Sequence, residues 1–356
     1  MNPAPFELLC RHPDLFSSSL LVVGNGANQP AEWQQAMQLH QSHFLTWDWM
    51  THLAARPGLG ANSHFGVPGT VLATSLPATP DIVLLWPKSR QLGLTLISVL
   101  SQSANRVWII GANDSGGKSI GNACKKIGVT ANKVDAARHC SMWQLESPAD
   151  IPPTSWEEHH KHFTVGSHQY STLPGVFSHG ELDKGTALLL EALAEQPFRH
   201  APPSILDLGC GSGVIGLSLQ QRFEEATLTL ADTDALALSC CHTNIHRSGM
   251  NPDTIQVIAS DKLSEIKGRY KLIVTNPPFH TGTETDYRFA QTLFAQARQH
   301  LAPYGEIWVV ANRHLSYEEW ATASFSSVDV VTQAAGFKIL RLHSPVKGNQ
   351  SPRRAR

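Results

Sequence analysis

The sequence predicts an α/β fold made of two tandem doubly wound domains, each with a parallel sheet between layers of helices. Three observations lead to this prediction. The chain has 356 residues, about the length of two typical domains. In the second half, short apolar segments alternate strictly with segments of helical periodicity, which is typical of parallel sheets. Three strand-like segments of the first half recur in the second half in the same order.

The second half contains the clearer set of elements. The apolar residues 204–208 end in a glycine-rich turn, which is typical of a buried parallel strand. Further strands are expected at residues 226–231, 254–259, 270–275 and 306–311, and helices at residues 214–223, 235–247 and 289–301. Ligands of such sheets bind at the carboxyl ends of the strands, so the residues that follow each strand are candidates for function.

The first half resembles the second half segment by segment. The matching pairs are residues 20–26 with 205–211, residues 81–87 with 271–277, and residues 107–111 with 307–311. Their offsets of 185, 190 and 200 residues drift only slightly, which favours duplication over chance similarity among buried strands. Where the second half has Asp207 and Asn276, the first has Val22 and Trp86. We therefore expect the N-terminal domain to be a degenerate, non-catalytic copy.

Composition shifts suggest where the domains begin and end. We expect the degenerate domain at residues 1–150, a proline-rich linker at 151–172, and the second domain at 173–346. Residues 347–356 form a basic tail, which we expect to be disordered and able to hold phosphates without sequence preference.

The composition also narrows the class of protein. Hydrophobic residues make up 42% of the chain and charged residues 16%, as in soluble globular proteins. No apolar run approaches the roughly 20 residues of a membrane span, and no signal-peptide pattern is present, so we expect a cytoplasmic protein with no membrane partner. The six cysteines include no CxxC pair, which argues against zinc and disulfides. The net charge is −1, so any nucleic-acid contact must come from a local patch.

The turn after residues 204–208 carries the pattern DLGCGSG, from Asp207 to Gly213. Its glycines allow a sharp turn with room for a ligand, and the following helix presents free N–H groups. The Asp207 carboxylate suits a ligand with ammonium and sulfonium groups, such as S-adenosyl-L-methionine, and suits a pyrophosphate badly. However, residues 211–216 also satisfy the dinucleotide pattern GxGxxG, and Asp232 would hold a ribose in either case. The loop alone favours S-adenosyl-L-methionine only modestly.

A second motif, Asn276-Pro277-Pro278-Phe279, follows the strand expected at residues 270–275. An exocyclic amino group on a base is a poor nucleophile because its lone pair is delocalised into the ring. Two acceptors, the Asn276 side-chain oxygen and the Pro277 carbonyl, would raise the electron density on that nitrogen. The prolines keep the turn rigid, and Phe279 offers a face for stacking. The two motifs together predict methyl transfer to an amino group of a nucleic-acid base, without a metal.

With these motifs, the second domain resembles the class I, seven-stranded methyltransferases of the NPPF type, and residues 173–178 and 182–186 extend the match. Nearly the whole chain resembles the bacterial small-subunit (16S) ribosomal RNA guanine-N2 methyltransferases. In that family a degenerate Rossmann-like methyltransferase domain precedes an active one. In the first half, the resemblance rests on residues 8–12, 86–88 and 132–135.

The resemblance implies methylation of the guanine 2-amino group at guanosine 1207 of 16S rRNA, on the assembled small ribosomal subunit, with S-adenosyl-L-methionine as the methyl donor. The implied cofactor-binding residues are Asp207, Gly209, Gly211 and Gly213 in the loop, Asp232 at the ribose, Asp261 near the adenine amino group, and Phe177 beside the cofactor. The implied guanine-binding residues are Asn276, Pro277, Pro278 and Phe279. We also expect a monomer without a bound metal.

Several alternative functions stay open. A large-subunit rRNA guanine-N2 methyltransferase carries nearly the same motifs. A protein-glutamine methyltransferase acts on a similar nitrogen but usually has tyrosine in place of Phe279. An NAD-dependent oxidoreductase would explain GxGxxG but not the motif at Asn276. An RNA-binding assembly factor with a dead catalytic domain would give Asp207 and Asn276 no function.

Three further patterns have weaker interpretations. Residues 112–119 fit a relaxed P-loop, but no strand ends in the acidic residue that such a site needs, so contact with an RNA phosphate is the better interpretation. The histidines of the linker lack ordered ligand spacing and are expected on a solvated face: His159, His160, His162 and His168. Lys338 and Arg341, on the last expected strand, are candidate RNA contacts.

Overall fold

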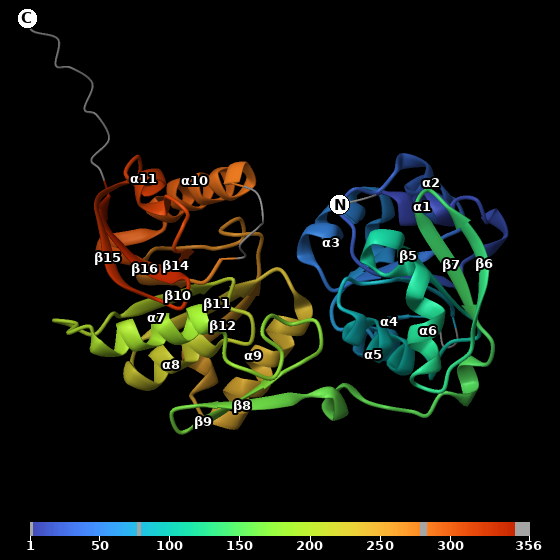
Figure 1. The fold of residues 1–356 in the computed structure, drawn as a ribbon, viewed down its shortest axis with the longest axis horizontal. Coiled ribbons are helices and arrows are strands. Elements are labelled where there is room, and N and C mark those ends of the chain that lie inside the picture. Colours follow the sequence, from blue (N-terminus) through green and yellow to red (C-terminus); the bar gives the residue numbers. More distant parts are fainter. Residues whose placement is uncertain (1–2, 77–79, 278–282, 346–356) are drawn as a thin grey trace, which may run out of the picture. The chain divides into compact units, whose positions relative to one another are not determined.

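The computed structural model describes residues 3–76, 80–277 and 283–345 (Figure 1). The chain forms two compact units. The first holds residues 1–161, 172–179 and 233–239, and the second holds residues 162–171, 180–232 and 240–356. No helix within the described ranges is long and apolar enough to cross a membrane.

The first unit contains a seven-stranded sheet with the order β3-β2-β1-β4-β5-β7-β6. Its strands are β1 (Leu20–Val23), β2 (His43–Thr46), β3 (Ser63–Phe65), β4 (Asp81–Leu85), β5 (Val107–Ala112), β6 (Ala131–Ala137) and β7 (Cys140–Leu145). The first five strands pair in parallel, and β7 runs antiparallel to β5 and β6.

Helices cover both faces of this first sheet (Figure 1). On one face lie α1 (Ala4–Leu9), α2 (Ala31–Leu39) and α3 (Trp49–Leu59), and on the other lie α4 (Thr70–Ser75), α5 (Arg90–Ser101) and α6 (Ile120–Lys125). The central strands β1 and β4 are buried along their whole length because both faces are covered.

The second unit contains a seven-stranded sheet with the order β12-β11-β10-β13-β14-β16-β15. Its strands are β10 (Ser204–Leu208), β11 (Thr227–Asp232), β12 (Ile255–Ala259), β13 (Tyr270–Thr275), β14 (Leu301–Asn312), β15 (Phe325–Ala334) and β16 (Phe337–Pro345). The strands β10 to β14 pair in parallel, and β16 runs antiparallel to β14 and β15.

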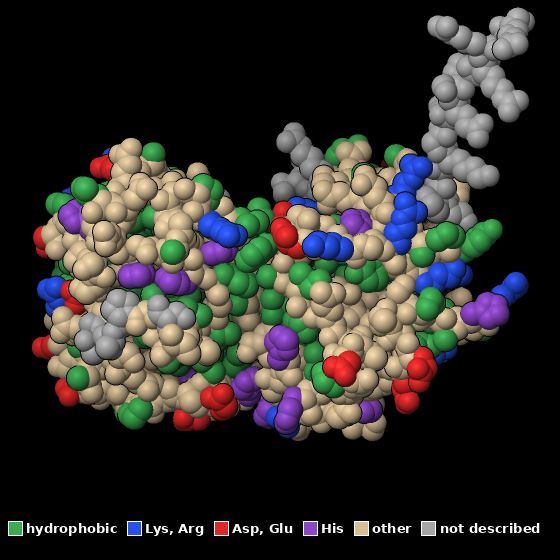
Figure 2. Space-filling model, turned by 180° about the vertical axis from the view of Figure 1, so that it is seen from behind, with side chains coloured by type: hydrophobic (Ala, Val, Ile, Leu, Met, Phe, Trp, Pro, Cys, Tyr) green, Lys and Arg blue, Asp and Glu red, His purple; other side chains and the backbone are tan. Residues whose placement is uncertain are grey.

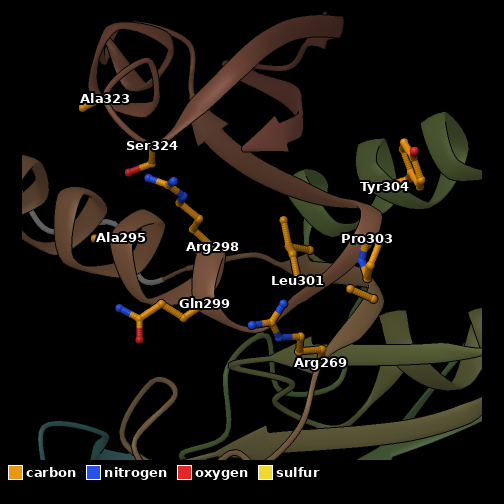
Figure 3. Close-up of a pocket in the computed structure, with 10 residues that line it drawn as sticks. Arg269, Ala295, Arg298, Gln299, Leu301, Pro303, Tyr304, Ala323 and Ser324 are labelled. Atoms are coloured by element: carbon orange, nitrogen blue, oxygen red, sulfur yellow. The ribbon is translucent and has the colours of Figure 1, made fainter. Parts of the chain in front are cut away.

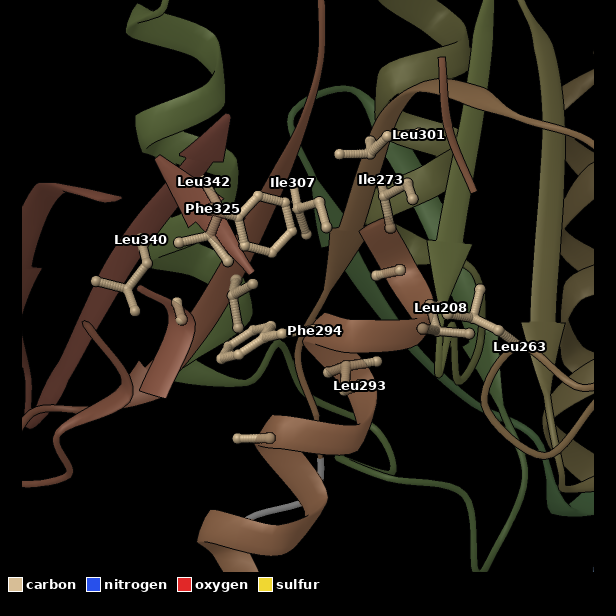
Figure 4. Packing of buried hydrophobic residues seen from close by; sticks show 14 of the residues in the cluster. Leu208, Leu263, Ile273, Leu293, Phe294, Leu301, Ile307, Phe325, Leu340 and Leu342 are labelled. Carbon is tan, nitrogen blue, oxygen red and sulfur yellow. The ribbon is translucent and has the colours of Figure 1, made fainter. Parts of the chain in front are cut away.

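The helices of this second sheet also form two layers (Figure 1). They are α7 (Lys184–Glu195), α8 (Val214–Arg222) and α9 (Ala235–Ser248) on one face, and α10 (Thr283–Gln299) and α11 (Tyr317–Ala321) on the other. Figure 4 shows Leu293 and Phe294 of α10 in the buried cluster that also contains Ile307 and Phe325, with Phe294 next to Phe325. These four side chains are at most 3% exposed, so α10 holds β13 and β14, and therefore the turn after β13, in place.

The two sheets have the same strand order when each is numbered from its own first strand. Strand β1 corresponds to β10, β4 to β13, and β5 to β14. These are the three pairs of segments whose sequences resemble each other, so the prediction of two tandem doubly wound domains is confirmed.

Most predicted elements lie within two residues of the observed ones, and two differ more. Helix α10 begins at Thr283 rather than at residue 289, because its first turns are polar and give no apolar periodicity. Strand β14 begins at Leu301, five residues earlier than expected, because Pro303 and Gly305 conceal its start. The register between β13 and β14 shifts between Tyr270 and Leu272, which accommodates these extra residues.

The segment predicted as a linker contains regular structure. Strands β8 (Lys161–Val165) and β9 (His168–Thr172) form a two-stranded sheet, preceded by single turns of 3-10 helix at Pro148–Asp150 and Trp156–His159. The polar composition of the hairpin gave no apolar alternation from which it could be predicted. The exact domain boundaries stay a prediction.

Candidate active site

Four residues with polar side chains lie at one edge of the second sheet. Asp207 is the penultimate residue of β10, Asp232 ends β11, Asp261 follows β12, and Asn276 follows β13. These strands are parallel and adjacent in the order β12-β11-β10-β13, so their carboxyl ends meet at the same edge. The structure thus brings together the residues that were predicted from separate motifs.

The loop after β10 requires glycine because of its backbone conformation. Gly209, Gly211 and Gly213 have φ angles of +68°, +54° and +82°, a region that other L-residues rarely adopt. A Cβ atom added to Gly209 or Gly211 would meet no described atom within 4 Å, whereas at Gly213 it would lie 3.2 Å from the Cys241 sulfur. The first two glycines therefore border open space in which a ligand can approach the main chain.

Asp207 is fully buried, and only one of its two carboxylate oxygens has a hydrogen-bond partner among the described residues. Its Oδ2 accepts a hydrogen bond from the Gly216 N–H at 2.8 Å, in the first turn of α8. Among the described residues, its Oδ1 is buried and has no hydrogen-bond partner. Burial raises the pKa of this carboxyl to about 7; the hydrogen bond from Gly216 opposes the rise, and the nearby Asp232 adds to it. An unsatisfied buried acceptor of this kind suits a ligand that brings a cationic donor.

Asp232 ties the loop to the neighbouring strand. Its Oδ2 accepts a hydrogen bond from the Gly211 N–H at 2.8 Å, which fixes the turn. Asp261 lies one strand further along, with its carboxylate 30% exposed and 3.3 Å from the Lys262 ammonium. The two carboxylates thus follow adjacent strands on the same side of the glycine loop, as a ligand extended along this edge would require.

The amide of Asn276 is held by two side chains from the start of α7. Its Nδ2 donates to Asp183 Oδ2 and to Thr186 Oγ1, both at 2.9 Å. Since a carboxylate only accepts hydrogen bonds, the atom that faces Asp183 is the amide nitrogen. The amide oxygen is therefore turned to the other side, and no hydrogen bond within the described ranges uses it. The sequence motifs did not predict this arrangement, although 182–186 was part of the family resemblance.

Asp183 has a second role, as the N-cap of α7. Its Oδ2 also accepts a hydrogen bond from the Thr186 N–H at 2.8 Å. One carboxylate oxygen thus orders both the start of a helix and the candidate acceptor Asn276. An acidic N-cap three residues before threonine is a recognisable sequence signal, but it indicates only the helix start.

The remaining predicted residues are placed less completely. Pro277 is buried directly after Asn276, while Pro278 and Phe279 lie outside the described residues. Phe177 lies between β9 and α7 with 65% of its surface exposed. Within the described ranges, no group of three or more histidine, cysteine, aspartate or glutamate side chains is arranged to hold a metal ion.

The corresponding edge of the first sheet lacks these polar groups. Val22, in the position of Asp207, is a fully buried residue of β1. Trp86, in the position of Asn276, is 9% exposed, and its ring would lie 2.6 Å from a Cβ added at Gly93 of α5. A large indole thus occupies the place where the second unit has an amide, which explains physically why this edge is unsuited to the same chemistry.

Two candidate RNA contacts are engaged within the protein. The ammonium of Lys338 is 6% exposed and donates to both carboxylate oxygens of Glu318, at 2.6 and 2.7 Å. The guanidinium of Arg341 lies 2.6 Å from a Glu306 carboxylate oxygen. The selection of Lys338 as an RNA contact was wrong, because its ammonium is buried against Glu318; that of Arg341, whose side chain is 31% exposed, stays a prediction. On the face in Figure 2, lysine and arginine side chains form small groups rather than a continuous basic surface.

Comparison with known proteins assigns both halves of the chain to methyltransferase families. The Methyltransferase small domain N-terminal family matches residues 7–163, and the Methyltransferase small domain family matches residues 168–341. The curated proteins named Ribosomal RNA small subunit methyltransferase C are similar along most of the chain. The Pseudomonas entomophila protein is 33% identical over 94% of this chain and 97% of its own length. The Hahella chejuensis protein is 36% identical over 83% of this chain and 85% of its own length.

A solved structure shares the fold of the whole chain. It is that of the T. thermophilus 16S rRNA N2 G1207 methyltransferase (RsmC), in complex with AdoMet and guanosine. It matches with a TM-score of 0.71 at 22% identity and covers 94% of this chain and 91% of the T. thermophilus chain. The tandem arrangement of two Rossmann-like domains is thus common to both proteins. Given the identity and coverage of the curated relatives, the chain belongs to the family of the ribosomal RNA small subunit methyltransferases C.

Proposed function

We propose that this protein transfers a methyl group from S-adenosyl-L-methionine to the 2-amino group of a guanine in 16S rRNA, on the small ribosomal subunit. The observation that carries the proposal is the fixed amide of Asn276, whose oxygen is left as an acceptor at the sheet edge that holds the glycine loop. The name of the T. thermophilus neighbour makes guanosine 1207 the specific target that we propose.

The residues at the edge fit S-adenosyl-L-methionine. Asp207 Oδ1 is a buried acceptor without a partner among the described residues, and it would receive the ammonium of the methionine part. The open space at Gly209 and Gly211 would admit that part of the cofactor against the main chain. Asp232 would hold the ribose, and Asp261 would accept from the adenine amino group, with Phe177 beside the cofactor. A pyrophosphate would instead meet the Asp207 and Asp232 carboxylates, so a dinucleotide fits this edge less well.

When bound, the cofactor supplies a methyl group on a positively charged sulfur, which is a good leaving group. The protein has to position and activate the nitrogen. The Asn276 oxygen and the Pro277 carbonyl would each accept one N–H of the guanine amino group, which raises electron density on the nitrogen. The Asp183 carboxylate strengthens the Asn276 oxygen as an acceptor, because a donor amide bonded to an anion becomes more polarised. Phe279 and Pro278 would hold the face of the base.

The guanine has to be unpaired or flipped from a helix before its amino group can reach this edge. The relatives named for the small subunit favour 16S rRNA over large-subunit RNA as the substrate. We infer further that the chain acts as a monomer, in the cytoplasm and without a metal. Sedimentation, cell fractionation and elemental analysis of the purified protein test these three points.

The test of the function is transfer of radiolabelled methyl from S-adenosyl-L-methionine to small subunits that lack the modification. Large subunits serve as the comparison substrate, and Asn276→Ala as the control variant. We expect label in N2-methylguanosine of 16S rRNA with the unaltered protein and none above background with the variant. Label on large subunits alone, or no label on any ribosomal particle despite cofactor binding, would contradict the proposal.

A further inference from the structure

A concave surface lies at the opposite edge of the second sheet from the candidate active site. It has a volume of about 720 Å³ and lies where β13 and β14 begin, next to the end of α10 (Figure 3). The residues that carry the argument are Arg269, Arg298, Tyr304 and Ser324, and we call this surface the Tyr304 pocket. Asp207 and Asn276 lie at the carboxyl ends of the parallel strands, whereas Arg269 and Leu301 lie at the amino ends. The Tyr304 pocket is therefore separate from the candidate active site.

The charge of the Tyr304 pocket is positive. Arg269 and Arg298 both line it, and no aspartate or glutamate does. Arg269 is exposed, and among the described residues its guanidinium has no ion pair. Figure 3 shows the guanidinium of Arg298 directed towards Ser324 and that of Arg269 near Leu301. Such a local group of cations is what a chain with a net charge of −1 needs in order to contact a polyanion.

Tyr304 adds an exposed aromatic ring at the rim of this pocket, and Figure 3 shows the ring beyond Pro303, directed away from Arg298. Its side chain is 90% exposed, the highest value among the large hydrophobic residues that are described. The backbone at Tyr304 has φ of +57°, a strained conformation for a residue other than glycine. A Cβ added at the next residue, Gly305, would lie 2.9 Å from two carbonyl oxygens, so the chain is closely packed there. The irregular start of β14 thus presents the ring to solvent at a cost in strain.

A further cation lies beside the ring. The Lys271 ammonium is 5.5 Å from the Tyr304 ring centroid and donates to the Pro303 carbonyl at 2.9 Å. The ring is therefore flanked by positive charge on the protein side and open on the solvent side. Cations that follow a phosphate backbone, combined with an aromatic ring on which a base stacks, are the usual means of holding single-stranded nucleic acid.

We propose that the Tyr304 pocket binds a single-stranded segment of the RNA substrate, with one base stacked on Tyr304 and adjacent phosphates at Arg269 and Arg298. The proposal rests on the proposed function, since it assumes that the substrate is an RNA. The proposed active site would accommodate one guanine, whereas a ribosomal particle extends well beyond it. A contact at the opposite edge of the sheet would therefore increase the affinity for the RNA and fix its position on the protein, without taking part in methyl transfer.

The experiment compares variants of the full-length protein. Tyr304→Asn removes the ring while keeping a residue that tolerates positive φ, and Tyr304→Phe keeps the stacking face. Arg269→Gln removes one cation. Lys126→Gln, at the exposed end of α6 in the first unit, is the matched control for loss of one surface charge. The measurements are KM and kcat on unmodified small subunits, binding of labelled 16S rRNA at several salt concentrations, cofactor affinity, and melting temperature.

We expect Tyr304→Asn to raise KM and weaken RNA binding about tenfold, with kcat and cofactor affinity unchanged. Arg269→Gln should reduce the slope of a plot of log affinity against log salt concentration by about one, because one fewer counterion is released from the RNA. Tyr304→Phe and Lys126→Gln should behave like the unaltered protein. Equal RNA affinity and KM in all variants would overturn the pocket proposal while leaving the proposed function intact. If the unaltered protein methylates no particle, the proposed function fails, and the RNA-binding series still decides whether the Tyr304 pocket holds RNA.

Discussion

Replacing Asp183 by serine would separate the two roles of this carboxylate. Serine is a good N-cap and can keep the hydrogen bond to the Thr186 N–H, but its shorter side chain cannot reach the Asn276 amide. The helix start should therefore survive, while Asn276 keeps only its contact with Thr186. The variant tests whether orientation of Asn276 by Asp183 matters for methyl transfer.

The magnitude follows from the contact that is lost. A hydrogen bond to a charged group contributes about 1.5–3 kcal/mol, and each 1.36 kcal/mol of transition-state stabilisation is about tenfold in rate. If the bond serves to orient and polarise the acceptor, kcat should fall about 10- to 100-fold. Cofactor affinity and KM for the small subunit should change little, because Asp183 would touch neither ligand. The free energy of unfolding should fall by about 1.5–3 kcal/mol, because the same bond is lost from the folded state, and the rate is therefore measured where the variant stays folded.

The assay is single-turnover methyl transfer to unmodified small subunits, together with calorimetric cofactor binding and urea unfolding. Asp183→Asn is the conservative control: it keeps the shape and the cap but loses the charge, so its rate should lie between those of the serine variant and the unaltered protein. A serine variant with kcat within twofold of the unaltered protein would refute the positioning role. A rate lost in parallel with cofactor binding would refute it equally.

Four other predictions follow from the same edge and from the core. Burial raises the pKa of Asp207 to about 7, so most of this carboxyl is protonated and uncharged at pH 6. A cationic ligand should therefore bind about tenfold more weakly at pH 6 than at high pH, where the carboxylate is fully charged. Calorimetry should show that the Asp207→Asn variant lacks this pH dependence. Because the pKa of Asp207 is raised from its ordinary value of 3.8 to about 7 in the folded protein, its contribution to the free energy of unfolding should fall as the pH rises from 3.8 to about 7. Thermal melts of the Asp207→Asn variant should lack this fall. Gly211→Ala, at φ of +54° in open space, should cost about 1–2 kcal/mol of stability but reduce cofactor binding more strongly, and unchanged affinity would show that no ligand approaches there. Phe294→Ala should lower the free energy of unfolding by about 3–5 kcal/mol in urea titrations, since its ring is fully buried; a loss below 1 kcal/mol would contradict the description of the core.

The fold class and much of the candidate site could be predicted from local sequence patterns. The alternation of buried strands and helices predicted a doubly wound sheet, and three recurring segments identified the second copy. Asp207, Asp232 and Asn276 were predicted to act together because each follows a parallel strand, and such ends share one edge. The hairpin of β8 and β9 and the start of β14 could not be predicted, since polar residues and a proline conceal them.

The pairing of distant side chains was decided by tertiary structure alone. Asn276 and Asp183 lie 93 positions apart, and the periodicity of neither segment indicates their hydrogen bond. The unsatisfied oxygen of Asp207 likewise depends on which groups pack around it. Lys338 looks like a surface cation in the sequence, yet an inner strand carries it against Glu318.

The sequence by itself therefore determined the duplication, the glycine loop and the acceptor motif at a strand end, because each depends on residues close together in the chain. The tertiary structure decided which oxygen of Asp207 stays unpaired, which way the Asn276 amide faces, and that Arg269, Arg298 and Tyr304 line one pocket. The physical reason is that burial, hydrogen-bond direction and local charge are set by neighbours in space, which only the packed chain brings together.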